Sequence, residues 1–283
     1  MSPATARGMA REALGRIAAL VLAAILAAVV ILPVVALVLR VTPARFVAQL
    51  GDSGVRESLW LSVKTSVAAT LLCLVLGLPM AYLLATRRFP GKRAVEVLMD
   101  LPMVIPPTVA GFALLMAFGR AGLLGRTLST FGITLPFSTA GVVVAQVFMA
   151  VPFLVGAARA GFEAVDRRYL DAAATLRAGE FTTFWRVRIP LAMPGIVAGV
   201  GMAWARALGE FGATITFAGN LAGTTRTVPL DVYLRLQENL DAAATLSLLL
   251  VVMAAVLLTA MRQAGLGLFA PQRASSLAPL PAR

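Results

Sequence analysis

The sequence predicts an all-α polytopic membrane protein with about six transmembrane helices. Of its 283 residues 59% are hydrophobic and only 13% are charged, whereas about a quarter of the residues of a soluble domain carry charge. A helix needs about 20 residues to cross the hydrocarbon core of a bilayer. Six uncharged runs are near or above this length, and they cover residues 17–39, 65–85, 101–119, 127–158, 189–205 and 242–261.

The first apolar run has two interpretations, because three arginines precede it, as they would in a secretory signal peptide. The run over 17–39 is longer than the 7–15 apolar residues of such a peptide, and no small-x-small cleavage site precedes Arg40. We therefore expect a retained first span.

Residue types that commonly serve catalysis or metal binding are missing or scarce in the sequence. The chain has no histidine and a single cysteine, Cys73, so it offers no disulfide framework and lacks the commonest general base and metal ligand. It also contains neither a G-x-S-x-G motif nor a G-x-x-x-x-G-K-[ST] phosphate-binding loop. We expect no cofactor in this chain, and the enzyme class that stays open is a serine hydrolase without that motif.

The chain has a net charge of +12, and the distribution of its lysines and arginines predicts the orientation of the spans. If both termini are cytoplasmic, 16 of the 25 lysines and arginines fall inside and 7 fall in outside loops, which agrees with the positive-inside rule. We therefore expect no nucleic-acid partner. The expected organisation is a cytoplasmic N-terminus over 1–16, a transmembrane domain over 17–262, and a disordered Ala/Pro/Ser-rich cytoplasmic tail over 263–283.

The hexapeptide DAAATL occurs twice, at residues 171–176 and 241–246. The predicted topology places the first copy in the cytoplasm and the second at the outer end of the last span. A true internal repeat should extend past six residues, and this one does not. We interpret it as a coincidence in a chain rich in Ala and Leu.

The longest inside connection, over residues 159–188, is predicted to contain two short helices separated at Gly179, because loops of this length rarely lack secondary structure. Each helix has an apolar face. These faces consist of Leu170, Ala173, Ala174 and Leu176, and then of Phe181, Phe184, Trp185 and Val187. Such an element lies on the lipid surface, packs under the span ends, or docks a cytoplasmic partner.

This connection resembles a pattern found in the permease subunits of bacterial ABC importers, which is E-A-A, three residues, G, nine residues, and I-x-L-P. Here the residues are Asp171-Ala172-Ala173, three residues, Arg177, nine residues, and a V-R-I-P run ending at Pro190. Asp replaces Glu, and Arg177 stands where the family has Gly. Because Gly tolerates the left-handed backbone at a helix end, we expect the turn to move to Gly179.

The resemblance implies a coupling helix between the fourth and fifth spans that sits in a cleft of an ATP-binding subunit. The implied coupling residues are Asp171, Ala172, Ala173, Arg177, Gly179 and Pro190. It further implies a homodimer in the bacterial inner membrane, two cytoplasmic ATP-binding subunits that hold ATP and Mg²⁺, and a periplasmic or lipid-anchored binding protein. The chain itself would hydrolyse nothing.

Two further stretches, residues 101–125 and 205–233, look like the molybdate branch of these importers. The first contains paired prolines followed by Thr-Val-x-Gly, and the second contains Ala-Arg-x-Leu-Gly-Glu followed by F-G-A-T and F-A-G-N. The resemblance implies transport of molybdate or tungstate. A sulfate or thiosulfate permease is an alternative. A stand-alone secondary transporter is less favoured, since such proteins tend to carry intramembrane carboxylates and inverted repeats.

The same stretches supply the candidate pathway and gate residues. Prolines within a span free backbone groups, which is tolerated where a cavity is lined, and glycines allow close helix approach. Arg206 and Glu210 are four residues apart on one helix face, so they form either a structural ion pair or a pair that reorganises at the pathway. The other candidates are Pro106, Pro107, Thr108, Gly212, Thr214, Thr216 and Asn220.

Overall fold

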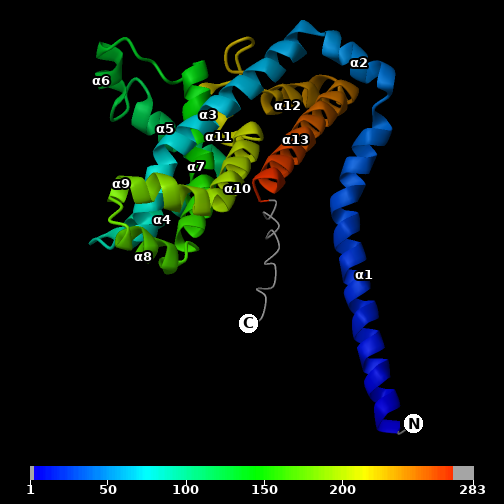
Figure 1. Ribbon diagram of the computed structural model, residues 1–283. Helices are drawn as coiled ribbons and strands as arrows, with labels where there is room; N and C mark the ends of the chain where they lie inside the picture. The colour runs from blue at the N-terminus through cyan, green and yellow to red at the C-terminus, as the bar shows by residue number, and fades with distance from the viewer. Residues whose placement is uncertain (1–2, 270–283) are drawn as a thin grey trace, which may run out of the picture.

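The computed structural model describes residues 3–269, and every regular element in this range is helical (Figure 1). The elements are α1 (Pro3–Arg40), α2 (Pro43–Gly51), α3 (Ser53–Thr86), α4 (Lys92–Val104), α5 (Pro107–Phe118), α6 (Gly125–Thr130), α7 (Thr139–Glu163), α8 (Arg167–Thr175), α9 (Glu180–Thr183), the π-helical turn η1 (Phe184–Arg188), α10 (Ile189–Leu208), α11 (Gly212–Ala218), α12 (Val228–Glu238) and α13 (Leu240–Phe269).

The expected fold class is confirmed. Five stretches of the described chain are helical, long and apolar enough to cross a membrane, and the bent pair α4–α5 supplies a sixth if it is counted as one span. The five stretches are Gly15–Arg40, Ser53–Thr86, Thr139–Glu163, Glu180–Leu208 and Leu240–Ala260.

Helices α3, α7 and α10 form the tightly packed centre of the molecule, where small residues bring backbones together. A methyl group added to Gly195 of α10 would lie 2.6 Å from the carbonyl oxygen of Ala157 and 2.7 Å from the Cα of Gly161 in α7. Such close approach is typical of membrane helices, whose association depends on van der Waals packing. A buried cluster that includes Ala81, Leu84 and Ile196 fills the end of this centre nearest η1.

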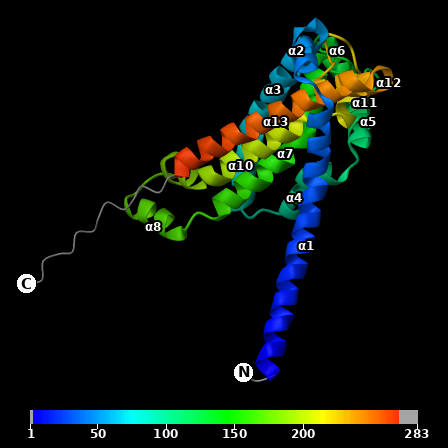
Figure 2. The ribbon, with the colours of Figure 1, turned by 90° about the vertical axis from the view of Figure 1, so that its right-hand side faces the viewer.

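Helix α1 stands away from the bundle along most of its length and meets it at its own C-terminal end (Figures 1 and 2). There the Asp241 carboxylate at the start of α13 lies 3.1 Å from an Arg40 nitrogen and 2.8 Å from an Arg45 nitrogen. None of the most apolar window of α1 is buried within this chain. Its hydrophobic surface is therefore left for lipid or for another protein.

Two of the expected spans differ from the observed helices. The run over 101–119 is divided at Ile105 and Pro106 into α4 and α5, with a bend of 120°, because a proline lacks the backbone N–H that would continue a helix. The run over 127–158 is longer than its span, since α7 begins only at Thr139. Its first part forms α6 and an outer segment.

The second short helix expected in the inside connection is continuous with the fifth span. The helical stretch runs from Glu180 to Leu208, and Pro190 lies within it. The backbone N–H of Ile189 donates to the carbonyl oxygen of Phe184, five residues back. This π-helical turn lets the helix pass Pro190 without a break, because it shifts the hydrogen-bond register just before the missing donor.

Helices extend into both of the expected terminal segments, and the location of these segments stays a prediction. Most of the segment expected as a cytoplasmic N-terminus, residues 1–16, belongs to α1, which begins at Pro3. Helix α13 continues to Phe269, into the segment 263–283 that was expected to be a tail. Residues 270–283 lie outside the described residues.

Candidate functional sites

Helix α8 lies in the connection between α7 and α10 and starts at an N-cap made by Asp166. Its carboxylate accepts hydrogen bonds from the side-chain Nε of Arg168 at 2.8 Å and from the backbone N–H of Arg168 at 2.9 Å. The hydrogen bond from the Arg168 side chain has the larger effect on the pKa of Asp166, and the bond from the Arg168 backbone N–H adds to it. Both lower this pKa below its ordinary value. The cap satisfies one of the free N–H groups of the first turn.

Helix α8 ends at Thr175 and the turn after it is made at Arg177, so the expectation that the turn would move to Gly179 is wrong. Arg177 itself adopts a left-handed backbone with φ of 52°, while Gly179 has an ordinary φ of −65°. The N–H of Arg177 donates to the carbonyl of Ala174 at 2.9 Å, and the N–H of Ala178 donates to that of Ala173 at 3.0 Å. These two bonds form a Schellman motif, whose geometry determines where the left-handed residue falls.

Large apolar side chains are exposed along α8, α9 and η1. Asp171 and Ala172 are also exposed, whereas Ala173 faces the protein and is buried. Exposed apolar side chains gathered in one place are typical of an interaction surface. We call this region the coupling surface and define it by Tyr169, Ala172, Leu176, Phe181 and Trp185, of which Leu176 is 82% exposed.

An aromatic cluster attaches the coupling surface to the bundle. The Tyr82 ring of α3 packs edge-on against Phe184 at 4.8 Å between centroids and against Phe162 of α7 at 5.5 Å. The Arg188 guanidinium lies over the Tyr82 ring at 5.6 Å, and Arg87 pairs with Glu180 at 2.9 Å. Movement of the coupling surface would therefore be transmitted to α3, α7 and α10.

The two helix breaks lie against each other in the structure. One break separates α4 from α5 before Pro107, and the other separates α10 from α11 before Gly212. A methyl group on Gly212 would lie 2.7 Å from the Cβ of Pro107 and 3.3 Å from the backbone nitrogen of Thr108. The candidates Pro106, Pro107, Thr108 and Gly212 are thus brought together, and the first three are exposed.

Arg206 and Glu210 form the ion pair expected from their spacing. The Glu210 side chain is 1% exposed, and its Oε2 lies 2.5 Å from Nη1 of Arg206. Its Oε1 accepts a hydrogen bond of 2.7 Å from the backbone N–H of Ala213. Glu210 therefore caps α11 while it neutralises Arg206, which supports the structural interpretation of this pair.

The remaining candidates lie along α11 and beyond it. The Thr216 hydroxyl donates to the carbonyl of Gly212 at 2.9 Å, and the Thr214 hydroxyl is buried without a hydrogen-bond partner among the described residues. Asn220 lies farther out, where it donates to the carbonyl of Leu230 at 3.4 Å and accepts from Arg226 at 3.1 Å. It therefore belongs to the outer loop and not to the paired breaks.

Two buried residues of α5 and α7 escaped the sequence analysis. A methyl group on Gly111 would lie 2.6 Å from the carbonyl oxygen of Ala213 and 2.7 Å from the Cβ of Thr216, so Gly111 permits α5 and α11 to pack. Gly111 is the glycine of the Thr-Val-x-Gly run, so the sequence held a signal for this close helix contact. Gln146 of α7 is buried, and its Oε1 has no hydrogen-bond partner within residues 3–269. A lone glutamine in an apolar run gave no comparable signal.

The sequence profile of one protein family matches residues 74–266, and its description is binding-protein-dependent transport system inner membrane component. The match covers more than half of the chain. The chain belongs to this family. The membership confirms the family resemblance carried by the connection around Asp171.

Curated members of this transport family are similar over most of the chain. Molybdenum transport system permease protein ModB of Mycobacterium tuberculosis is 49% identical over 80% of this chain and 86% of the relative. ModB of Escherichia coli is 44% identical over 64% of this chain and 80% of the relative. The probable transport system permease protein NifC of Clostridium pasteurianum is 34% identical over 86% of this chain and 85% of the relative.

Solved structures support the fold of this family member. A bacterial ABC transporter involved in the import of the acidic polysaccharide alginate superposes with a TM-score of 0.74, over 92% of this chain and 97% of the other, at 15% identity. The MetNI methionine ABC transporter gives a TM-score of 0.60 over 75% of this chain and 94% of the other, at 18% identity. At such identities the likeness concerns the fold alone.

Proposed function

We propose that this chain is the transmembrane subunit of an ATP-driven ABC importer for molybdate or tungstate. The observation that carries the proposal is the 49% identity with a molybdenum transport permease over 80% of the chain. The aligned region of 227 residues includes the broken spans as well as the connection around Asp171, because it covers most of the transmembrane domain. A sulfate or thiosulfate permease is the alternative that the experiment below separates.

The proposed assembly is a homodimer in the bacterial inner membrane, with both termini in the cytoplasm. Two features support a second copy. The apolar surface of α1 has little contact with its own bundle, and the broken spans expose Pro106, Pro107 and Thr108. A twofold partner would cover the broken spans and enclose a pathway between the two copies.

The proposed mechanism couples ATP hydrolysis to the broken spans through the bundle. Two cytoplasmic ATP-binding subunits, which hold ATP and Mg²⁺, would each dock on one coupling surface. When they close on ATP, they would pull the two coupling surfaces together, and the Tyr82 cluster would pass this movement to α3, α7 and α10. The pathway would then open outward to a binding protein, and hydrolysis would reset it.

The paired breaks are proposed to line the pathway. They carry neutral groups, namely freed backbone groups and the hydroxyls of Thr108, Thr214 and Thr216, and the one arginine beside them is already paired with Glu210. A neutral lining binds a tetrahedral oxyanion weakly, which lets it pass. Selectivity would then reside in the external binding protein.

The test of substrate and class is uptake of radiolabelled molybdate in cells without their own molybdate importer. The cells express this chain with its cognate ATPase and binding protein, and excess sulfate serves as competitor. We expect uptake that requires the ATPase and is unaffected by sulfate. Uptake abolished by sulfate would move the chain to the sulfate branch, and uptake without the ATPase would contradict the ABC importer.

The test of docking is Ala172→Trp, which adds a bulky side chain to the exposed face of α8. We expect the purified permease to lose its ATPase subunit, because the new side chain would collide with the cleft that receives α8. Arg167→Trp, in the first turn of the same helix, is the control for added bulk and should retain more of the subunit. Loss of transport with the complex intact would count against docking through Ala172.

A further inference from the structure

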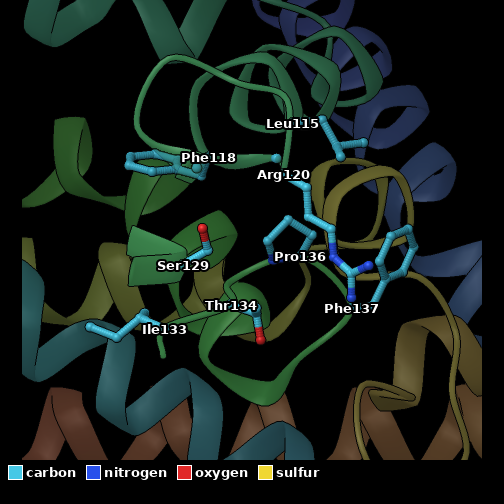
Figure 3. A pocket seen from close by; sticks show the side chains of 10 residues that line it. Leu115, Phe118, Arg120, Ser129, Ile133, Thr134, Pro136 and Phe137 are labelled. Atoms are coloured by element: carbon cyan, nitrogen blue, oxygen red, sulfur yellow. The ribbon is translucent and has the colours of Figure 1, made fainter. Parts of the chain in front are cut away.

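An outer cavity of about 630 Å³ lies between the end of α5, helix α6 and the segment that leads into α7 (Figure 3). Its walls include the apolar side chains Leu115, Phe118 and Phe137, and its polar groups are Arg120, Ser129 and Thr134. Figure 3 shows the Arg120 side chain extending along Pro136 so that its guanidinium lies beside the Phe137 ring. The cavity is therefore apolar with a single cationic group.

The cation in this cavity lacks an internal counter-ion. No Asp or Glu occurs between Leu101 and Phe162, and Arg120 forms no ion pair or side-chain hydrogen bond within the described part of the chain. Four other arginines of the predicted outer loops have partners in the protein, whereas Arg56 and Arg126, like Arg120, form no ion pair among the described residues. Arg40 and Arg45 pair with Asp241, Arg235 pairs with Asp231, and Arg226 donates to Asn220. Arg120 is thus available to an anionic partner.

The surroundings of the cavity fit a protein partner from the aqueous side. Helix α7 has 25 residues, about 37 Å at 1.5 Å per residue, so it spans the hydrocarbon core by itself. The segment before Thr139 then lies at or beyond the outer interface. Leu123, Leu124 and Phe131 are exposed nearby, and apolar or aromatic side chains around an arginine are enriched at protein interfaces.

The size of the cavity argues against a free oxyanion as its occupant. Cavities of about 300–1,000 Å³ enclose drug-sized molecules, and a volume of about 630 Å³ has room for several side chains. A tetrahedral oxyanion consists of five heavy atoms and would leave most of this space empty. A protruding segment of a protein would fill it.

The cavity walls are attached to α11, which follows the break at Glu210. The N–H of Phe137 donates to the carbonyl of Phe217 at 3.4 Å, and a methyl group on Gly219 would lie 3.0 Å from the Phe137 ring. The Phe118 and Phe217 rings are 6.4 Å apart between centroids. An occupant that presses on Phe118 and Phe137 would therefore act on one of the two broken spans.

We propose that this cavity receives a protruding, carboxylate-bearing segment of the external binding protein, and that Arg120 pairs with its carboxylate. The proposal rests on the proposed function, since it requires an importer with such a partner. It adds the anchor on the permease and the chemistry of the segment that the anchor selects. The attached α11 gives docking a direct route to the broken spans.

The experiment measures binding of the purified binding protein to the complete permease–ATPase complex in nanodiscs. Arg120→Glu should weaken binding at least tenfold, because it replaces the attraction between Arg120, which is exposed at the cavity, and the carboxylate with repulsion between like charges. Arg120→Lys should weaken it less. Arg126→Glu makes the same charge change on α6 outside the cavity lining and should change binding less than threefold.

A cross-linking series locates the contact. Ser129→Cys lies in the cavity lining, and Thr127→Cys is an exposed control on the same helix. With a short thiol–carboxylate cross-linker, Ser129→Cys should capture a segment of the binding protein that contains Asp or Glu, and Thr127→Cys should capture several-fold less. Replacing that acidic residue with Arg should restore binding to Arg120→Glu.

Several outcomes would overturn the proposal. Equal weakening by Arg120→Glu and Arg126→Glu would show diffuse attraction to the outer face, and unchanged binding by Arg120→Glu would remove the anchor. An effect that disappears in nanodiscs of uncharged lipid would assign the cavity to an anionic lipid headgroup. If the wild-type complex takes up molybdate but Arg120→Glu binds normally, only this inference fails. If the wild-type complex binds no binding protein, the proposed function fails with it.

Discussion

The hexapeptide DAAATL belongs to a helix or its last turn in both of its positions, yet one copy is mostly exposed and the other is mostly buried. In the first copy, at the end of α8, Leu176 is 82% exposed, whereas its counterpart Leu246 in α13 is 0% exposed. Asp171 forms no ion pair within the described chain, while Asp241 bridges Arg40 and Arg45. The same six residues thus contribute to a candidate docking surface in one place and to the protein core in the other.

The difference separates what local sequence decides from what packing decides. Ala and Leu favour a helix wherever they occur, so both copies are helical. The first is ended by a Schellman motif at Arg177, and the second continues into an apolar run whose Leu246 packs with Val55, Val228 and Leu249. Identical local sequence therefore carries no information about burial.

The largest expected difference between the copies comes from shortening their leucines. Leu246→Ala should destabilise the permease by about 2–5 kcal/mol, because it leaves a cavity in a packed cluster. Leu176→Ala should change the free energy of unfolding by less than about 0.5 kcal/mol. Unfolding of the two purified variants in detergent measures both, and similar destabilisation would contradict the assigned burial.

The next largest change in stability is expected from substitution of Arg177, just after the end of α8. A left-handed backbone costs a non-glycine residue about 1–2 kcal/mol, and the extra chain entropy of glycine offsets part of this. Arg177→Gly should therefore stabilise the end of α8 by about 0.5–1 kcal/mol, measured by hydrogen exchange across residues 166–180. Gly179→Ala is the matched control and should be tolerated, because Gly179 has an ordinary φ and open space around it.

The aspartates of the two copies should differ by a smaller amount. Asp241→Ala removes two exposed ion pairs, each worth about 0–1 kcal/mol, and should let the outer end of α1 move away from α13. A spin-label distance between α1 and α13 measures this, and it should broaden in Asp241→Ala but stay narrow in Asp171→Ala. Equal distributions in both variants would show that apolar contacts alone hold α1.

The smallest expected effect is a pH dependence at the start of α8. The pKa of Asp166 is lowered in the folded protein, so its cap stabilises α8 above the unfolded pKa of about 3.9 and is lost as the pH falls through the folded value. Hydrogen exchange in the first turn, corrected for intrinsic rates, should stay constant from pH 7 to pH 5 and rise below about pH 4. Asp166→Asn should keep a cap and lose this pH dependence.

The sequence determined the composition-driven features of this protein. Uncharged runs predicted a polytopic helical protein, which the structure confirms, and the spacing from Asp171 to Pro190 predicted the family, which the comparisons confirm. Both signals are local. A span must be apolar along its own length, and the family pattern lies within residues 171–190. The cytoplasmic orientation of the termini and the roles of the individual coupling and pathway residues remain predictions.

Only the tertiary structure decided how distant segments meet. The paired prolines predicted a break, but the contact of Pro107 with Gly212 depends on how α5 and α11 pack. The left-handed residue fell at Arg177 and not at Gly179, because the hydrogen bonds of the helix end set its position. A second example is Leu246, whose burial depends on Val55 and Val228 in other helices. Local sequence chooses the helix, and contacts between residues far apart in the chain choose which face is covered.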